Sequence, residues 1–371
     1  MAKRLLGQSA ILSFILVVLS TLALAQEQIA TPNAASPVSS SPSAMARLAT
    51  LPEADTLIYI NTSRLLNEAA PKLLPEAELA KMRQQFTELR GFVGVDPSRV
   101  DFVVIGMRFR RPTADLHFVA PEFLVVSTGD FSAESLLTVA RLALQEKLTD
   151  ERYGTRNMSL VTIDEIARQS EKNPILRSFS QLGLAALSTN MLAAGNVDYL
   201  KAALDAADGR DRIKPETLNS LLRDVNALVS FAGSPWNSFA KSFGLRGTSD
   251  SPREAGCDSK LGDFYAAITM EETTFKLRGA MNADNPDTAK IINNLFSGML
   301  RSMASGAGNN KSVAALKMLS FSPHDSEVRL EADIPQQIVA DFIREQMKPK
   351  PAEPAKKPAA TRPVRKRRPN R

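Results

Sequence analysis

The chain has 371 residues, of which 44% are hydrophobic but only 6% are aromatic, with Trp236 as the single tryptophan. This composition supplies a core for one large domain or two ordinary ones, and it argues against a surface that stacks on carbohydrate. The single cysteine, Cys257, excludes an intramolecular disulfide. Because it sits among Gly256, Asp258 and Gly262 with no His nearby to activate it, we interpret it as incidental rather than as a reactive thiol or a dimer link.

The net charge of +6 is concentrated at one end of the chain. Residues 348–371 hold ten Lys and Arg against the single acid Glu353, a local charge of +9. The rest of the chain therefore carries −3, or −5 once Lys3 and Arg4 are also removed. The high isoelectric point of the whole chain is therefore due to the tail, and the rest of the chain is mildly acidic.

The first 25 residues are typical of a signal peptide. Lys3 and Arg4 precede an apolar run over 11–25, and Ala23-Leu24-Ala25 has small residues where signal peptidase reads them. We expect cleavage after Ala25 and export to the periplasm or the cell exterior. An uncleaved anchor is the weaker alternative, because the run is interrupted by Ser and Thr and is shorter than the roughly 20 residues of a span. A lipoprotein is excluded, since no Cys stands at the cleavage point. Residues 26–48 are rich in Ser, Pro and Ala and are expected to form a disordered linker.

An N-terminal α+β unit is predicted over 49–232. Short apolar runs predict strands at 57–60, 102–105 and 123–126, and helical spacing predicts a helix over 76–93. Ser132 is expected to cap a further helix. After it we predict a hairpin over 184–194, a helix over 197–207 and a helix starting at Pro215. The inward face of this last helix is expected to hold Leu218, Leu221, Leu222, Val225 and Val229.

A patternless stretch over 233–262 is expected to be a loop that separates a C-terminal α+β unit over 263–347. That unit is predicted to start with a hairpin of 264–270 and 275–281. Asn285-Pro286-Asp287 then begins a helix. Its continuous apolar face is expected to hold Ile292, Leu295, Phe296, Met299 and Met303. Strict alternation over 327–334 predicts a strand with one wet face, and a last helix follows.

The fold class expected from these elements is α+β, with antiparallel sheets each covered on one face by amphipathic helices. A similar order of elements before and after the loop raises the hypothesis of two related units. Gly-Asp-Phe occurs twice, at 129–131 and 262–264.

The exported leader, the Leu-Pro-x-Ala-Asp opening at 51–55 and the repeated sheet-plus-helix units resemble uncharacterised secreted bacterial proteins grouped as domains of unknown function. The resemblance covers residues 50–345. It implies an exported α+β protein and carries no known activity or site with it.

Motifs for catalysis or cofactor binding are not found in the sequence. His117 and His324 have no second His or Cys at ligand spacing, which argues against zinc. Neither a nucleophile elbow nor a phosphate-binding glycine motif occurs, and residues 205–211 break the spacing of a calcium loop. Asp164-Glu165 and Glu271-Glu272 are adjacent in sequence and so point to opposite sides. We therefore predict no catalytic, cofactor-binding or metal-ligating residue and no cofactor.

The tail over 348–371 is expected to be disordered, since six prolines and like charges oppose a helix or a core. It is the candidate contact for anionic envelope polymer or phospholipid, with no specific nucleic acid and no identified protein partner. The candidate polyanion-contacting residues are Arg362, Arg365, Lys366, Arg367, Arg368 and Arg371.

The function expected is that of an exported, non-enzymatic binding or envelope-associated protein. One alternative is a carrier of an apolar small molecule or lipid, held between a sheet and the helix over 285–303. Met299 and Met303 suit an adaptable pocket of that kind. Another alternative is an enzyme of unrecognised type.

Overall fold

The computed structural model describes residues 42–94, 96–109, 121–144, 147–162, 181–234, 262–306 and 317–346. The expected signal peptide, most of the linker, nearly all of the loop over 233–262 and the basic tail lie outside these ranges. Their structure and processing remain predictions. The described end of the predicted linker, residues 42–48, forms a helix with Leu48 buried in the core rather than a disordered segment.

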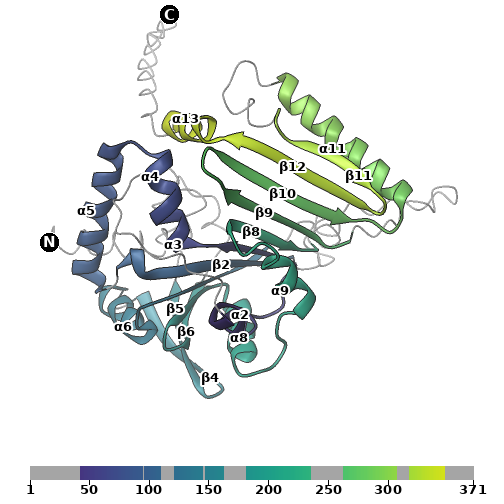
Figure 1. The fold of residues 1–371 in the computed structure, drawn as a ribbon. Helices are drawn as coiled ribbons and strands as arrows, with labels where there is room; N and C mark the ends of the chain where they lie inside the picture. Colours follow the sequence, from purple (N-terminus) through teal and green to yellow (C-terminus); the bar gives the residue numbers. More distant parts are fainter. Residues whose placement is uncertain are drawn as a thin grey trace, which may run out of the picture.

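The described residues form one antiparallel sheet of 12 strands in the order β11-β12-β10-β9-β8-β1-β2-β3-β7-β6-β5-β4 (Figure 1). The strands are β1 (Thr56–Ile60), β2 (Val100–Arg108), β3 (Glu122–Gly129), β4 (Leu148–Tyr153), β5 (Arg156–Thr162), β6 (Gln181–Ser188), β7 (Met191–Gly195), β8 (Ala227–Gly233), β9 (Phe264–Met270), β10 (Thr274–Asn282), β11 (Ser320–His324) and β12 (Glu327–Pro335). The α+β class is confirmed. The sheets that we expected as separate are one sheet, because β8 and β9 pair directly on either side of the predicted loop.

Helices lie on both faces of this sheet. They are α2 (Pro42–Leu48), α3 (Thr62–Arg64) continuing through the π-helical η1 (Leu65–Ala69) into α4 (Ala70–Leu73), α5 (Glu76–Val93), the 3-10 turn η2 (Pro97–Arg99), α6 (Ala133–Leu144), α8 (Val197–Ala207), α9 (Pro215–Leu221), α11 (Pro286–Gly306) and α13 (Gln336–Gln346). The predicted start of α6 and the predicted end of α5 agree with the local hydrogen bonding and backbone angles. The Ser132 hydroxyl accepts a hydrogen bond from Ser135 N at the start of α6, and Gly94, with φ of 74°, ends α5.

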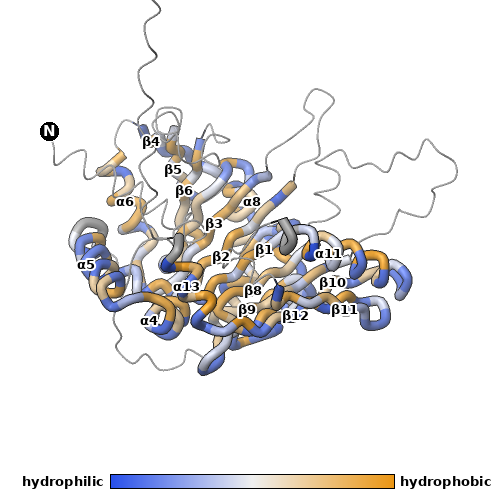
Figure 2. Tube along the Cα trace, turned by 90° about the horizontal axis from the view of Figure 1, so that it is seen from above, coloured by the Kyte–Doolittle hydropathy of each residue, from blue (hydrophilic) through white to orange (hydrophobic). Residues whose placement is uncertain are grey.

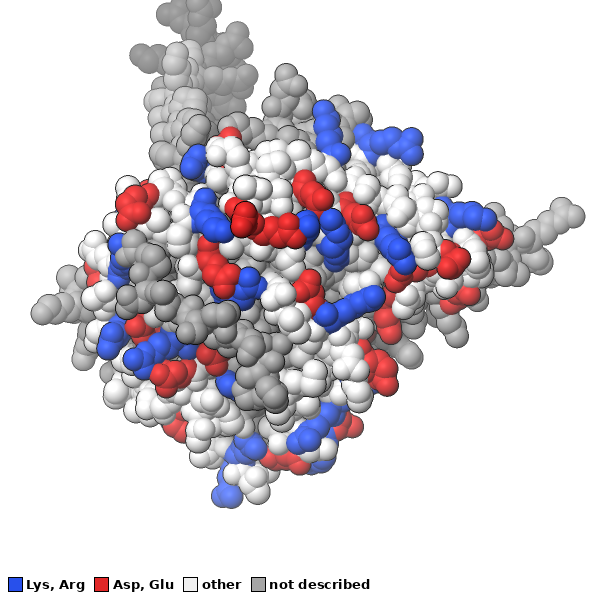
Figure 3. All heavy atoms as spheres, viewed as in Figure 1, with Lys and Arg blue, Asp and Glu red and all other residues white. Residues whose placement is uncertain are grey.

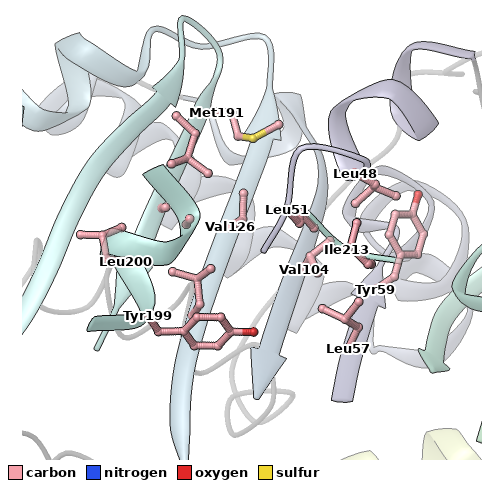
Figure 4. Close-up of a cluster of buried hydrophobic side chains, with 14 of the residues drawn as sticks. Leu48, Leu51, Leu57, Tyr59, Val104, Val126, Met191, Tyr199, Leu200 and Ile213 are labelled. Atoms are coloured by element: carbon pink, nitrogen blue, oxygen red, sulfur yellow. The ribbon is translucent and has the colours of Figure 1, made fainter. Parts of the chain in front are cut away.

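We call the side of the sheet that carries Leu57 and Tyr59 the α8 face. It holds the largest cluster of buried side chains among the described residues. Helix α8 places Tyr199 and Leu200 on it, both fully buried, as Figure 4 shows. Helices α2 and α9 contribute to the same cluster, including Leu48. Hydropathy is highest in the central strands that form its floor (Figure 2).

The α11 face is the opposite side, which carries Ile58 and Ile60. In the half of the sheet formed by β1–β7, α6 covers this face over Leu184 and Ala194. In the half formed by β9–β12, α13 packs near Phe275 and α11 packs near Val328. Strands β1–β7 are therefore covered on both sides, which differs from the single covered face that we expected.

The predicted helix starting at Pro215 is shorter than expected. Helix α9 ends at Leu221, and an Asx turn follows in which Asn226 N donates to the Asp224 carboxylate. Val225 is 56% exposed, and Val229 belongs to β8 rather than to the helix. The apolar run after the turn is short, and such runs do not distinguish a strand from a buried helix.

Candidate binding surface on the C-terminal half of the sheet

Helix α11 is positioned by its cap and by a small apolar contact with the edge of the sheet. Thr288 N donates to the Asn285 side chain over 2.8 Å, and Pro286 occupies the first turn. Ile292 is buried against Val328 of β12, and Phe296 stacks on Phe321 of β11 with ring centroids 5.4 Å apart. These contacts fix one side of α11 on β11 and β12.

A second apolar line runs along α11 beside the residues that face the sheet. Ile291, Leu295 and Met299 are 67%, 51% and 51% exposed. Residues four apart lie on one side of a helix, so the three side chains form a continuous stripe. We call these three residues the α11 stripe. Exposed apolar side chains that form a contiguous patch mark an interaction site more often than isolated ones do.

The α11 stripe corrects the expected apolar face of this helix. Ile292 and Phe296 face the sheet as predicted, but Leu295 and Met299 do not. The side chain of Met303 lies outside the described residues. Because Met299 points into solvent, the arrangement favours a contact at the surface over an enclosed pocket lined by methionine.

Two cations flank the α11 stripe in the sequence. Lys290 and Arg301 are exposed, and no charged residue lies between them in the sequence. Lys290 pairs with Asp287 over 2.9 Å, and the hydrogen bond from Lys290 holds the pKa of Asp287 below its ordinary value. Helix α11 thus carries an exposed apolar stripe beside the side that faces the sheet, and the positive charge of Lys290 is balanced by Asp287.

The last helix lies on the same face of the sheet as α11. Helix α13 buries Ala340 near Phe275 of β10, with Val339 partly buried beside it, and leaves Phe342 38% exposed. Phe275 and Met281, which packs near α11, are six positions apart on β10 and therefore point to the same side. Helix α13, the last described element, therefore lies on the sheet face that carries α11. The basic tail follows α13 directly in the sequence.

The opposite side of β10 and β12 is charged. Arg278 pairs with Asp333 over 2.6 Å, and Lys276 pairs with Glu271 over 2.5 Å. Figure 3, in the orientation of Figure 1, shows acidic and basic side chains interspersed over this part of the sheet. Such a mixed charged face is typical of a hydrated surface. It confirms the wet face predicted for 327–334.

A buried polar cluster on the α8 face was not visible in the sequence. The Arg108 guanidinium lies 4.2 Å from the centroid of the Tyr199 ring, and Glu122, opposite Arg108 in register, is only 7% exposed. Burial is the main cause that raises the pKa of Tyr199, and Arg108 opposes it. The cluster fixes α8 on the sheet at the ends of β2 and β3.

The polar residues considered in the sequence are dispersed. His324 ends the edge strand β11, with its side chain 56% exposed. Glu271 lies in the turn between β9 and β10, where it pairs with Lys276. Within the part of the chain that the structure describes, no group of three or more His, Cys, Asp or Glu is placed to hold a metal ion. His117 and Cys257 lie outside that part.

The predicted polyanion contacts also lie outside the described residues, as does Asp164-Glu165. The structure therefore neither brings Arg362, Arg365, Lys366, Arg367, Arg368 and Arg371 together nor separates them. What sequence reasoning missed is the α11 stripe. The signal was an apolar arc on α11 that is wider than one side of a helix, as Ile291 beside Ile292 indicates.

Among the helices that the structure describes, none combines the length and the hydropathy needed to cross a membrane.

Comparison with known proteins assigns no family to this chain. No protein-family model matches it, and no curated protein matches it. Among solved structures, crystal forms I and III of TP0453 each share 9% identity with it, at TM-scores of 0.38 and 0.41. The matches cover 81% and 80% of this chain and 96% and 97% of the other. With TM-scores this low, neither match supports an inference about function.

Proposed function

We propose that this protein is an exported, envelope-associated binding protein that docks through the C-terminal half of its sheet. The observation that carries the proposal is the α11 stripe, where Ile291, Leu295 and Met299 remain more than half exposed on the surface of the helix. Apolar side chains in this arrangement gain free energy only when a partner removes them from water.

The basic tail supports the same assignment. It carries +9 and follows α13, on the face of the sheet that also holds α11. A run of like charges is attracted to an anionic polymer or lipid surface, and the attraction weakens as salt is added. The α11 stripe and the tail would then contact the same surface of the envelope.

The test is co-sedimentation of the mature chain, starting at Gln26, with anionic phospholipid vesicles and separately with purified anionic wall polymer. A matched chain ending at Met347 lacks the tail, and both chains are measured across a salt series. We expect binding of the full mature chain that falls with salt and weakens when the tail is removed. Failure of the full chain to sediment with either material at low salt would contradict the proposal.

A further inference from the structure

We infer that the docking partner is an anionic phospholipid bilayer, with α11 lying in its interface and the α11 stripe inserted among the acyl chains. The inference rests on the proposed function and names the partner. An envelope polymer is polar and hydrated, so it offers charge contacts but no apolar interior for Ile291, Leu295 and Met299. A bilayer offers both, because its anionic head groups lie directly above hydrocarbon.

The geometry of the α11 stripe suits an interface rather than a pocket. Ile291, Leu295 and Met299 follow one another at intervals of four, so the stripe is about 12 Å long and runs nearly parallel to the helix axis. All three side chains can therefore enter a flat surface to a similar depth. Ile292 and Phe296, on the adjacent side of α11, hold the helix on the sheet.

The charges near the α11 stripe favour head-group phosphates. Arg301 follows the stripe in the sequence, and its long exposed side chain can reach a phosphate, whereas Lys290 is paired with Asp287. A single short apolar stripe supports only weak and reversible membrane binding, and a second signal is needed for stable attachment. The +9 tail, which follows α13 in the sequence, provides such a signal.

A second copy of the chain is a less suitable occupant. A stable interface needs about 800 Å² from each partner, which is more than three side chains provide. The +9 charge of a tail on each copy would also oppose pairing, because like charges repel each other. The same charges attract an anionic bilayer.

The insertion is tested with a fluorescent probe on the stripe. In a Trp236→Phe background, which removes the chain's own indole, Leu295→Trp places a probe on α11 and Leu142→Trp places a control probe on α6. Leu142 is 69% exposed, so both positions start in water. With vesicles of phosphatidylglycerol and phosphatidylcholine, some with brominated acyl chains, we expect the Leu295→Trp emission to shift to the blue and to be quenched by bromine. The Leu142→Trp emission is expected to remain unchanged.

The second test measures vesicle binding after the apolar side chains of the stripe are replaced. The double variant Leu295→Ser, Met299→Ser should bind vesicles about tenfold more weakly or worse, whereas its binding to wall polymer should not change. Leu142→Ser is the matched control and should bind vesicles as the parent does. Circular dichroism of each variant confirms that the fold is retained, which we expect because the substituted side chains are exposed.

The outcomes distinguish the inference from the proposed function on which it rests. Vesicle binding by the double variant equal to that of the parent, or an unquenched Leu295→Trp probe on bound protein, would overturn insertion while leaving envelope binding intact. A dimer in sedimentation equilibrium that the double variant dissociates, without lipid, would instead identify a second copy as the occupant. Absence of binding to both vesicles and polymer would refute the proposed function itself.

Discussion

Strands β1–β7 lie between helices on both faces, whereas β10–β12 have apolar packing on the α11 face and paired, partly exposed charges on the other. In the first region the exposed faces of the helices are mostly polar, and the buried side chains form large clusters. In the second region, α11 covers the edge of the sheet with one side and leaves the adjacent α11 stripe in solvent. The difference shows that the same sequence pattern, an apolar helix next to a sheet, serves folding in one region and is available for binding in the other.

Replacing one leucine in each region by alanine and comparing the loss in stability tests this difference most directly. Leu200 is fully buried on α8, and Leu200→Ala should lower the free energy of unfolding by about 3 kcal/mol, because the cavity left there cannot be filled by solvent. Leu295 is 51% exposed, and Leu295→Ala should change the free energy of unfolding by less than about 0.5 kcal/mol. Urea unfolding of both variants checks the pair. Similar losses would mean that α11 is as much a part of the core as α8 is.

The strands β1–β7, which helices cover on both faces, form the doubly covered region. A glycine in this region gives a second test of the comparison. A Cβ on Gly195 at the end of β7 would overlap the carbonyl oxygen of Phe123 and approach Leu124 Cα to 2.9 Å. Gly195→Ala should therefore cost about 2–3 kcal/mol in thermal or urea unfolding. Gly91→Ala on α5 is the control, since nothing lies within 4 Å of its added Cβ, and it should stabilise the protein by about 0.5–1 kcal/mol. A harmless Gly195→Ala would show that β7 and β3 can move apart at this point.

Alkaline pH should destabilise the doubly covered region. Burial, with a smaller contribution from Asp101, raises the pKa of Tyr59 from 10.0 to about 12. The unfolded chain thus releases this proton at lower pH than the folded chain does. The stabilisation is complete below about pH 10 and is lost as pH rises toward 12, at about 1.4 kcal/mol per pH unit.

The same argument applies to Tyr199, whose pKa burial also raises. Tyr59→Phe should therefore make the fall in stability less steep without abolishing it. Urea unfolding at several values between about pH 9 and pH 11 gives the slope. An identical slope for the variant and the parent would mean that Tyr59 does not titrate with unfolding.

Substitutions on the charged side of β10 and β12 should have the smallest effect on the free energy of unfolding. Arg278 and Asp333 are 41% and 56% exposed in their side chains, so Asp333→Asn should cost less than about 1 kcal/mol, and the cost should shrink in high salt. Thermal unfolding at low and high salt measures it. A larger loss that salt does not reduce would indicate that this face is covered in solution.

The sequence predicted most of the elements but not how they assemble. Strands and helices with strong periodicity, such as α5 and β12, are found where the pattern placed them. Strands β4 and β5 were missed because their residues are largely polar, although the turn at Gly154, with φ of 60°, was a readable hairpin signal. The pairing of β8 with β9 joins strands across a long stretch of chain, and local patterns contain no information about such contacts.

The binding surface shows the same limit. The sequence identifies an amphipathic helix beginning at Asn285, and its apolar arc is readable. Which part of that arc meets the sheet depends on α11 lying over the edge strands β11 and β12, which offer too little surface to cover Leu295 and Met299. That position follows from tertiary packing alone.

The most direct test of docking through α11 is photo-crosslinking of the mature protein to vesicles containing a photoactivatable anionic phospholipid, followed by tryptic peptide mapping. Cleavage after Lys290 and Arg301 gives a peptide of residues 291–301 that holds the whole α11 stripe, and cleavage after Arg141 and Lys147 gives a control peptide of residues 142–147 with exposed Leu142. We predict lipid adducts on the first peptide and none above background on the second. Equal labelling of the two peptides, or adducts confined to helices of the α8 face, would contradict the claim that the C-terminal half of the sheet is the docking region.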